Sequence, residues 1–214
     1  MQETTIINEY EYVYRDRDLP WNAYIIPPLL EMLSEVKKET KEKIRVLDLG
    51  CGNGSISNAI ALQGYEVVGV EDSVSGFKIA QASFPNCQFI QANIFDLPYT
   101  QLEKSFDIVF SSEVIEHLPY PRELLRGAKK CLKPDGTLIL TTPYHGYLKN
   151  LIIAILGKMD AHFSPLWDGG HIKFFSVKTL TTLLESEGYT DIKFKFAGRY
   201  PYLWKSMLSS SKIL

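Results

Sequence analysis

Short apolar runs rich in β-branched residues alternate with helix-like segments from Lys43 onward. This alternation predicts an α/β domain, a doubly wound and mostly parallel sheet with helices on both faces. The apolar runs predict strands at residues 44–49, 66–70, 88–91, 106–110, 137–142 and 191–196. The segments between them predict helices at residues 56–63, 75–83, 122–131 and 177–187. We therefore expect residues 43–214 to form the main domain.

Turn-forming residues support these boundaries. The triplet Pro134-Asp-Gly136 is a turn signal that predicts the start of the fifth strand, and Gly188 is placed to end the last helix. After residue 196 the chain is short and rich in aromatic residues and serines. The pattern therefore leaves open whether a seventh strand follows.

Residues 1–42 precede the alternation and are predicted to form a helical cover. A helix-like stretch at residues 27–41 begins with Pro27-Pro28, which suits a first helical turn. The aromatic residues of the cover are Tyr10, Tyr12, Tyr14, Trp21 and Tyr24. Two interpretations stay open: the cover lies over a bound ligand, or its aromatic side chains pack on the edge of the core.

Residues 143–175 are too long for an ordinary connection and are predicted to form a lid over a functional site. They contain an apolar helix at residues 148–156, followed by Phe163, Leu166 and Trp167. These side chains either line a pocket for an apolar substrate or bury themselves.

Composition narrows the possible partners. The 23 basic and 25 acidic residues give a net charge of −2, so the chain carries no overall attraction for nucleic acid. Its three widely spaced cysteines are typical of a reducing compartment, and we expect a cytoplasmic protein without structural zinc. The first residues lack a secretion signal, and the longest apolar run, residues 151–156, is too short to span a membrane.

Residues 46–54, VLDLGCGNG, place glycines at every second position directly after an apolar run. Gly50, Gly52 and Gly54 allow a sharp turn and a close approach to a ligand, which in open α/β sheets binds at the carboxyl ends of the strands. The dinucleotide fingerprint would require a third glycine at position 55, where the chain has Ser55. The run therefore argues against a cofactor bound through a pyrophosphate.

This run resembles the first motif of the class I S-adenosylmethionine (SAM) dependent methyltransferases, whose glycine loop lies against the amino-acid portion of SAM. The resemblance covers residues 43–196 and implies a Rossmann-like fold and SAM as the cofactor. The cofactor-binding residues that we expect from it are Asp48, Gly50, Cys51, Gly52, Gly54, Glu71, Asp72, Asn93 and Ile94.

Several of these residues have a specific expected role. Glu71 ends the second strand about twenty residues after the glycine loop, where a carboxylate can accept hydrogen bonds from two ribose hydroxyls. Asp72 or Ser73 is expected to cap the next helix. Asn93 stands where the family usually has Asp, and its carbonyl can accept from the adenine amino group while the Ile94 N–H donates to a ring nitrogen.

The roles of two residues of the first motif are less specific. Asp48 either approaches the ammonium of the cofactor or braces the glycine loop. Cys51 is expected to be a small residue at a crowded turn without thiol chemistry.

The end of the fourth strand carries Glu113, Glu116 and His117. If residues 113–117 form a helical turn, the i, i+3 and i+4 spacing puts the three side chains on one face. Two carboxylates and an imidazole clustered there would repel or stay protonated without a cation, whereas they suit Mg²⁺ or Mn²⁺, and the histidine favours a transition metal.

This run resembles two branches of the family, the ubiquinone-biosynthesis O-methyltransferases and the small-RNA 3′-terminal 2′-O-methyltransferases. In the second branch such residues and a later histidine hold a metal. Residues 170–176, GHIKFFS, resemble that later element and imply His171 as a fourth ligand. His145 and His162 stand near it in the sequence and compete for this role.

We therefore expect a SAM-dependent O-methyltransferase that acts on a small aromatic or apolar hydroxyl compound, with Glu113 and His117 as catalytic residues. In a metal-free version, His117 or His171 would act as a general base. The alternatives are an RNA 2′-O-methyltransferase, although nucleic acid is a poor match to the charge, and a non-catalytic SAM-binding module. A further hypothesis is that the apolar lid contacts a membrane surface, and the pattern predicts no oligomeric state.

Overall fold

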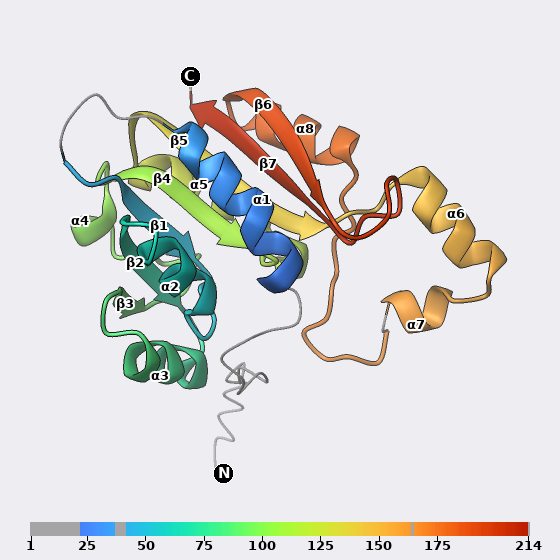
Figure 1. Cartoon of the computed structure of the whole chain (residues 1–214), viewed down its shortest axis with the longest axis horizontal. Helices are drawn as coiled ribbons and strands as arrows, with labels where there is room; N and C mark the ends of the chain where they lie inside the picture. The colour runs from blue at the N-terminus through green and yellow to red at the C-terminus, as the bar shows by residue number, and fades with distance from the viewer. Residues whose placement is uncertain (1–21, 37–41, 164, 214) are drawn as a thin grey trace, which may run out of the picture.

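A computed structural model describes residues 22–36, 42–163 and 165–213 and shows a seven-stranded sheet between helices (Figure 1). The strands are β1 (Arg45–Leu49), β2 (Glu66–Glu71), β3 (Gln88–Gln91), β4 (Phe106–Ser112), β5 (Leu132–Pro143), β6 (Tyr189–Ala197) and β7 (Ser206–Ile213). They follow the order β3-β2-β1-β4-β5-β7-β6, in which β7 runs antiparallel to both of its neighbours. The predicted mostly parallel α/β sheet is confirmed.

Helices cover both faces of the sheet. They are α1 (Asn22–Glu35), α2 (Ser55–Ala61), α3 (Val74–Ser83), α4 (Tyr99–Leu102), α5 (Pro121–Cys131), α6 (Tyr147–Ile155), α7 (Met159–Phe163) and α8 (Val177–Ser186), with a 3₁₀ turn η1 (Ile115–His117). Because successive strand residues point to opposite faces, Val46 packs in the core under α1 and α2, whereas Leu47 packs with α5 and α8.

The sheet winds in opposite directions from β1. This strand pairs in parallel with β2 on one side and with β4 on the other. The connections that leave the carboxyl ends of β1 and β4 therefore diverge, and this switch point is where open α/β sheets bind their ligands.

A seventh strand is present, which the sequence left open. β7 lies between β5 and β6, and its serines Ser206, Ser209 and Ser211 are buried within the sheet. Serine is a weak strand former by itself, so the strand owes its existence to the ladders with its two neighbours.

The expected turn at Pro134-Asp-Gly136 is wrong as the start of the fifth strand, because β5 already begins at Leu132. The register between β4 and β5 shifts between Phe106 and Ile108, and Asp135 has a positive φ of 62°. The turn residues therefore make an irregularity inside the strand. Gly188, two residues after the last residue of α8, has φ 79° and ends that helix as predicted.

The cover helix begins earlier than predicted. α1 starts at Asn22, so Pro27 and Pro28 lie inside the helix and not in its first turn. Proline removes backbone hydrogen bonds from a helix interior, and the burial of Leu29 and Leu33 against the sheet offsets that loss. The expected helix residues 37–41 lie outside the described residues, as do Tyr10, Tyr12, Tyr14 and Trp21.

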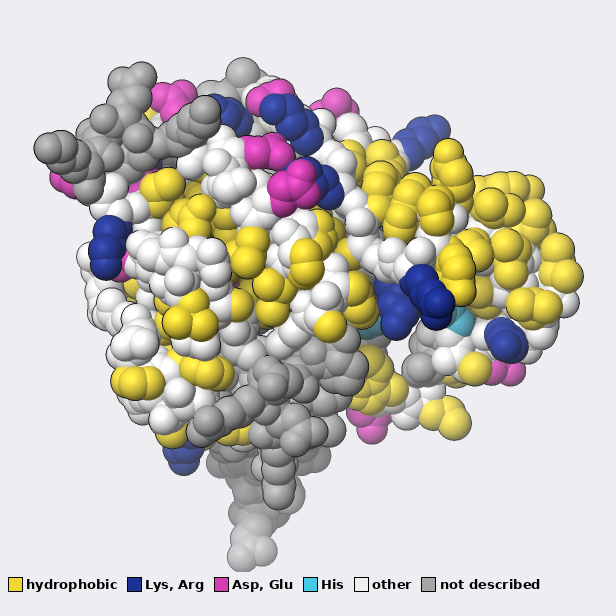
Figure 2. Space-filling view, in the orientation of Figure 1, with side chains coloured by type: hydrophobic (Ala, Val, Ile, Leu, Met, Phe, Trp, Pro, Cys, Tyr) yellow, Lys and Arg dark blue, Asp and Glu magenta, His cyan; other side chains and the backbone are white. Residues whose placement is uncertain are grey.

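The lid projects from the body of the molecule as α6 and α7 (Figure 1). In the described structure α6 buries no residue and does not line the cavity described below, so both expectations are wrong for the helix, whereas Trp167 lines that cavity as the pocket interpretation predicted. Tyr147 and Ile155 are 83% and 74% exposed, and the space-filling view shows hydrophobic side chains gathered on this projection (Figure 2). None of the described helices has the length and apolar character needed to cross a membrane.

Candidate active site

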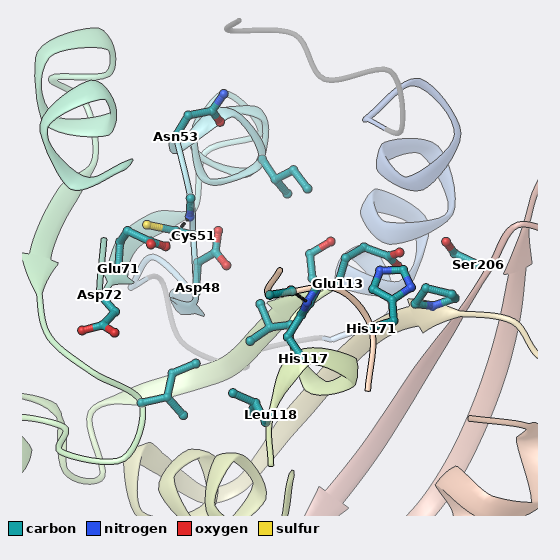
Figure 3. A pocket seen from close by; sticks show the side chains of 18 of the residues that line it. Asp48, Cys51, Asn53, Glu71, Asp72, Glu113, His117, Leu118, His171 and Ser206 are labelled. Atoms are coloured by element: carbon teal, nitrogen blue, oxygen red, sulfur yellow. Dashed lines mark hydrogen bonds between the residues drawn. The ribbon is translucent and has the colours of Figure 1, made fainter. Parts of the chain in front are cut away.

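A cavity of about 570 Å³ opens at the carboxyl ends of the central strands (Figure 3). The glycine loop after β1 and Glu71 at the end of β2 line one end of it. Glu113, His117 and His171 line the other end, and α1 and the lid add Tyr24 and Trp167. One continuous space thus joins the expected cofactor residues to the expected catalytic residues.

The glycine loop has backbone angles and neighbours that require glycine. Gly50, Gly52 and Gly54 have φ values of 77°, 56° and 78°. A Cβ on Gly50 would lie 2.6 Å from a methyl carbon of Val114, and one on Gly54 would lie 2.8 Å from the ring of Phe89. The loop therefore presents bare backbone to the cavity.

Asp48 is buried beneath this loop, with 1% of its surface exposed. Its Oδ2 accepts a hydrogen bond of 2.6 Å from Ser57 Oγ on α2, which is the bracing contact. Its Oδ1 has no hydrogen-bond partner among the described residues. Burial raises the pKa of Asp48 to about 7. The carboxyl group thus braces α2 with one oxygen and keeps the other for a ligand.

Glu71 is tied to the loop that it faces. Its Oε2 accepts from Gly52 N at 2.8 Å and its Oε1 from Ser73 N at 3.0 Å. Burial raises the pKa of Glu71 despite these two bonds. Each carboxylate oxygen keeps a further lone pair for a ligand hydroxyl. Ser73, and not Asp72, caps α3 by accepting from Gly76 N at 3.2 Å.

Asn93 is already hydrogen-bonded at both of its amide atoms. Its Nδ2 donates to Asp72 Oδ2 at 2.9 Å, and its Oδ1 accepts from Phe95 N at 2.8 Å. The expected adenine contact would therefore use the second lone pair of Oδ1. Ile94 and Cys51 line the cavity, and burial raises the pKa of Cys51 well above its usual range, so its thiol stays protonated.

The expected helical turn at residues 113–117 is wrong. η1 comprises only Ile115–His117, and Glu113 has a positive φ of 53°. This backbone directs the Glu113 carboxylate to Thr141, whose Oγ1 donates to Glu113 Oε1 at 3.0 Å. Glu113 therefore lines the cavity apart from the group that Glu116 forms with the histidines. Burial raises its pKa to about 7.

Glu116, His117 and His171 come together across η1 and the lid. One ligand atom from each lies within 4.8 Å of the others. Glu116 is fully buried, with 0% exposure, and its Oε2 accepts from Thr142 Oγ1 at 3.0 Å. Its Oε1 has no hydrogen-bond partner within the described part of the chain and lies 4.0 Å from His171 Nε2. Burial, with the nearby Glu113, raises the pKa of Glu116 well above its usual range.

The two imidazoles of this group are held neutral. Their ring centroids lie 4.8 Å apart, and His117 Nδ1 lies 2.7 Å from Gly169 O. Burial lowers the pKa of His117 and lowers that of His171 to about 4. Neutral imidazoles can accept a proton or bind a metal ion.

The competing histidines lie elsewhere. His145 and His162 have ring centroids 5.6 Å apart and pack with Phe163 and Phe174 within the lid itself. Neither of them lines the cavity. His171 is the lid histidine that joins Glu116 and His117.

Four further residues of the site do not stand out in the sequence. Lys205 and Ser206 reach the cavity from the start of β7, and Thr141 and Thr142 hold the two glutamates from the end of β5. Lys205 and Ser206 could be found only with the seventh strand in place. The two threonines are the last residues of the predicted fifth strand, a position that lies at the ligand-binding edge of a parallel sheet.

The fold and the cavity at the switch point define an α/β protein whose site suits a ligand that resembles a nucleoside. A family model described as a methyltransferase domain matches residues 19–193. The chain therefore belongs to this methyltransferase family, and membership implies SAM as the cofactor.

The curated relatives that match the chain are named as O-methyltransferases. The chain is 27% identical over 169 residues to the mitochondrial ubiquinone biosynthesis O-methyltransferase of Schizosaccharomyces pombe, covering 75% of this chain and 61% of the relative. It is 33% identical over 120 residues to the ubiquinone biosynthesis O-methyltransferase of Haemophilus ducreyi, covering 53% of this chain and 50% of that protein. The chain thus spans about half to three-fifths of the length of the curated relatives it matches.

Solved structures share the fold. A protein from Pyrococcus horikoshii OT3 has a TM-score of 0.70 at 21% identity, covering 94% of this chain and 95% of its own. A SAM-dependent methyltransferase from Archaeoglobus fulgidus has a TM-score of 0.66 at 18% identity, covering 90% and 97%. At these identities the likeness establishes the Rossmann-like fold.

The buried residues fit SAM. Asp48 Oδ1 is a buried acceptor without a partner among the described residues, and the glycine loop leaves no room for a Cβ at Gly50. The ammonium of SAM would satisfy the free oxygen of Asp48. The three-group cluster around Glu116 fits a divalent cation by the same reasoning, because Glu116 Oε1 is buried and faces neutral imidazoles.

Proposed function

We propose that this protein is a SAM-dependent O-methyltransferase acting on a small aromatic hydroxyl compound with a partly apolar body. The observation that carries the proposal is the single cavity that joins the glycine loop and Glu71 to Glu113, His117 and His171. Names of the relatives support O-methylation, and Trp167 and Val114 in the cavity wall suit an aromatic acceptor.

The cofactor end binds and orients SAM. Asp48 Oδ1 and the backbone of the loop from Gly50 to Gly54 would hold its amino-acid portion, and Glu71 its ribose hydroxyls. Asp72, Asn93 and Ile94 would hold the base. Bound SAM supplies an electrophilic methyl group on a sulfonium. A fixed position of that methyl against the acceptor lowers the entropic part of the barrier.

The acceptor end handles the proton of the hydroxyl group. As the acceptor oxygen bonds the methyl carbon, its proton must leave, and the sulfonium becomes a neutral thioether. Without a bound cation, His117 is neutral near pH 7 because burial lowers its pKa, so its free nitrogen can take this proton. Glu113, whose pKa burial raises to about 7, can act as a second base at the same end of the cavity.

We further propose that Glu116, His117 and His171 hold a divalent cation, with Glu113 as a neighbouring carboxylate. A carboxylate with two imidazoles favours Mn²⁺ or another transition metal over Mg²⁺. A cation supplies charge that lowers the pKa of a bound hydroxyl. The buried charge of Glu116 would then be neutralised by the cation.

Calorimetry tests the metal site. Mg²⁺, Mn²⁺ and Zn²⁺ are titrated into the protein saturated with S-adenosylhomocysteine, beside Glu116→Gln and a control, Glu185→Gln, which changes an exposed acid on α8. Binding that Glu116→Gln abolishes and Glu185→Gln retains supports the proposal. Absence of binding by the unchanged protein refutes the metal and leaves His117 as a plain base.

Methyl transfer tests the reaction. SAM is incubated with a panel of catechols, monophenols and amines, and methylated products are identified by mass spectrometry. O-methylated catechols support the proposal. Cofactor binding without any product would favour a non-catalytic SAM-binding module, and transfer to nitrogen would replace O- by N-methylation.

We also propose that the lid contacts a membrane surface, from which an apolar acceptor could be taken. The exposed apolar residues Tyr147 and Ile155 on α6 and Leu156 directly after it support this proposal. Ile155→Glu should reduce co-sedimentation with phosphatidylcholine vesicles, whereas Leu62→Glu, at a residue 70% exposed after α2, should not. Equal sedimentation of both variants and the unchanged protein would contradict it.

The three buried free cysteines support a cytoplasmic location, which cell fractionation tests.

A further inference from the structure

The lid reaches the candidate active site through its backbone as well as its side chains. Gly169 O lies 2.7 Å from His117 Nδ1, and both residues line the cavity. The carbonyl belongs to a tight turn in which Gly170 N donates to Trp167 O at 3.0 Å and Gly169 has φ 75°. A hydrogen bond from the lid therefore meets the imidazole that lies at the reacting end of the cavity.

This hydrogen bond decides which nitrogen of His117 carries the proton. A backbone carbonyl can only accept a hydrogen bond, so Nδ1 must donate. A neutral imidazole has a single N–H, and the other nitrogen then carries a free lone pair. With Nδ1 protonated, Nε2 is the nitrogen that can take a proton or bind a metal ion.

The lid segment that provides this carbonyl is itself fastened next to His117. Ile172 N and Lys173 N both donate to Glu116 O at 2.9 Å. The Trp167 ring meets the His117 ring edge to face, with centroids 5.8 Å apart. The turn around Gly169 and the 3₁₀ turn η1 therefore form one packed unit, and the carbonyl keeps its place only when the lid lies on η1.

We propose that Gly169 is a positioning residue whose carbonyl fixes the Nδ1–H tautomer of His117, so that folding of the lid onto η1 makes Nε2 available. Such second-layer hydrogen bonds set the tautomer of catalytic and metal-binding histidines in many proteins. The functional consequence rests on the proposed reaction at His117. The tautomer itself does not, and it can be measured without any substrate.

Nitrogen-15 NMR of histidine-labelled protein at pH 8 tests the tautomer. The chain has four histidines, and the His117 signals are those lost in His117→Gln. We expect a protonated Nδ1 and an unprotonated Nε2 in the unchanged protein. Gly169→Ala strains a backbone with positive φ and should move the carbonyl, which would shift His117 towards the Nε2–H tautomer.

Two further variants separate the hydrogen bond from backbone strain. Gly157→Ala carries the same kind of strain, with φ 64°, in the lid after α6, where a Cβ would meet nothing within 4 Å among the described atoms. Gly170→Ala disturbs the Gly169 turn by crowding, because its Cβ would lie 2.9 Å from Trp167 O. We expect the tautomer to change in Gly170→Ala and to stay unchanged in Gly157→Ala.

The outcomes are distinct. A proton on Nε2 of the unchanged protein, or one tautomer in all variants, overturns the inference. If methyl transfer is found, Gly169→Ala should lower kcat about tenfold or more with a smaller change in KM, in line with other second-layer substitutions. If the tautomer follows the prediction and no methyl transfer is found, the proposed function fails and the positioning role of Gly169 stands.

Discussion

Replacing Gly54 by alanine should destabilise the protein for two separable reasons. Gly54 has φ 78°, a left-handed angle that costs an L-residue about 1–2 kcal/mol. The added Cβ would also lie 2.8 Å from the ring of Phe89 and 2.9 Å from the Cβ of Ala80. Ala80 Cβ is fixed to the backbone of α3, so the crowding costs about 1–3 kcal/mol more. Together these effects predict a loss of about 2–5 kcal/mol.

Two other glycines isolate the separate contributions. Gly64 has φ 93° and open space around its Cβ position in the described structure, so Gly64→Ala should lose about 1–2 kcal/mol through strain alone. Gly69 does not have the left-handed angle, but its Cβ would lie 2.7 Å from Phe89 and 2.8 Å from Cys51 Sγ. Gly69→Ala should lose about 1–3 kcal/mol through crowding alone.

Urea unfolding followed by circular dichroism measures all three losses, provided that the slope with urea stays constant. Adding Phe89→Leu to Gly54→Ala should restore part of the loss, because the smaller side chain relieves the contact with residue 89 and leaves both the contact with Ala80 and the strain. A Gly54→Ala loss no larger than that of Gly64→Ala would refute the crowding argument. Full restoration by Phe89→Leu would refute the strain argument.

Three further predictions concern buried polar groups. His145→Phe should change the free energy of unfolding in favour of the variant by about 2 kcal/mol more at pH 5 than at pH 8. Burial lowers the pKa of His145 to about 4, so between pH 6.5 and pH 4 the histidine is protonated in the unfolded chain and neutral in the folded protein, which destabilises the unchanged protein. Thermal unfolding at both pH values checks this. Ser57→Ala removes the donor to Asp48 Oδ2 and should lower the free energy of unfolding, measured in urea, by about 1–3 kcal/mol. The loss should be larger at pH 8 than at pH 6, because the hydrogen bond stabilises the ionised carboxylate of Asp48. An equal loss at both pH values would contradict this. In the presence of a chelator at pH 8, Glu116→Gln should raise the free energy of unfolding by about 1–2 kcal/mol, and the melting temperature with it, because burial disfavours the ionised carboxylate that the unfolded chain carries at this pH. A lower melting temperature would show that the carboxyl group stabilises the metal-free fold.

The central parallel strands β1, β2 and β4 were predictable because they are buried on both faces and read as apolar runs. The ends of β1, β2 and β3 fall within about one residue of the expected positions. β7 was left open because serines at Ser209 and Ser211 carry no apolar signal, and only the neighbouring strands reveal their burial. The starts of α1 and β5 were wrong because the prolines there were taken as boundary signals.

The sequence identified most of the residues of the candidate site but predicted their spatial arrangement less well. The sequence identified Glu116, His117 and His171, which the structure brings within 4.8 Å of one another. It placed Glu113 with them, because a positive φ at a residue other than glycine leaves no mark in the sequence. The contact from Gly169 O to His117 could not be foreseen, because a backbone carbonyl is common to every residue.

The position of β7 has a consequence for how the protein is made. β7 is the last of the described strands to leave the ribosome, yet it lies between β5 and β6, and β6 pairs with no other described strand. At roughly 5–20 residues per second, β5 waits several seconds with one edge unpaired before β7 is delivered. During that interval the nascent chain exposes a long strand edge that can pair with other chains, so its yield should depend on chaperones more than its final stability suggests.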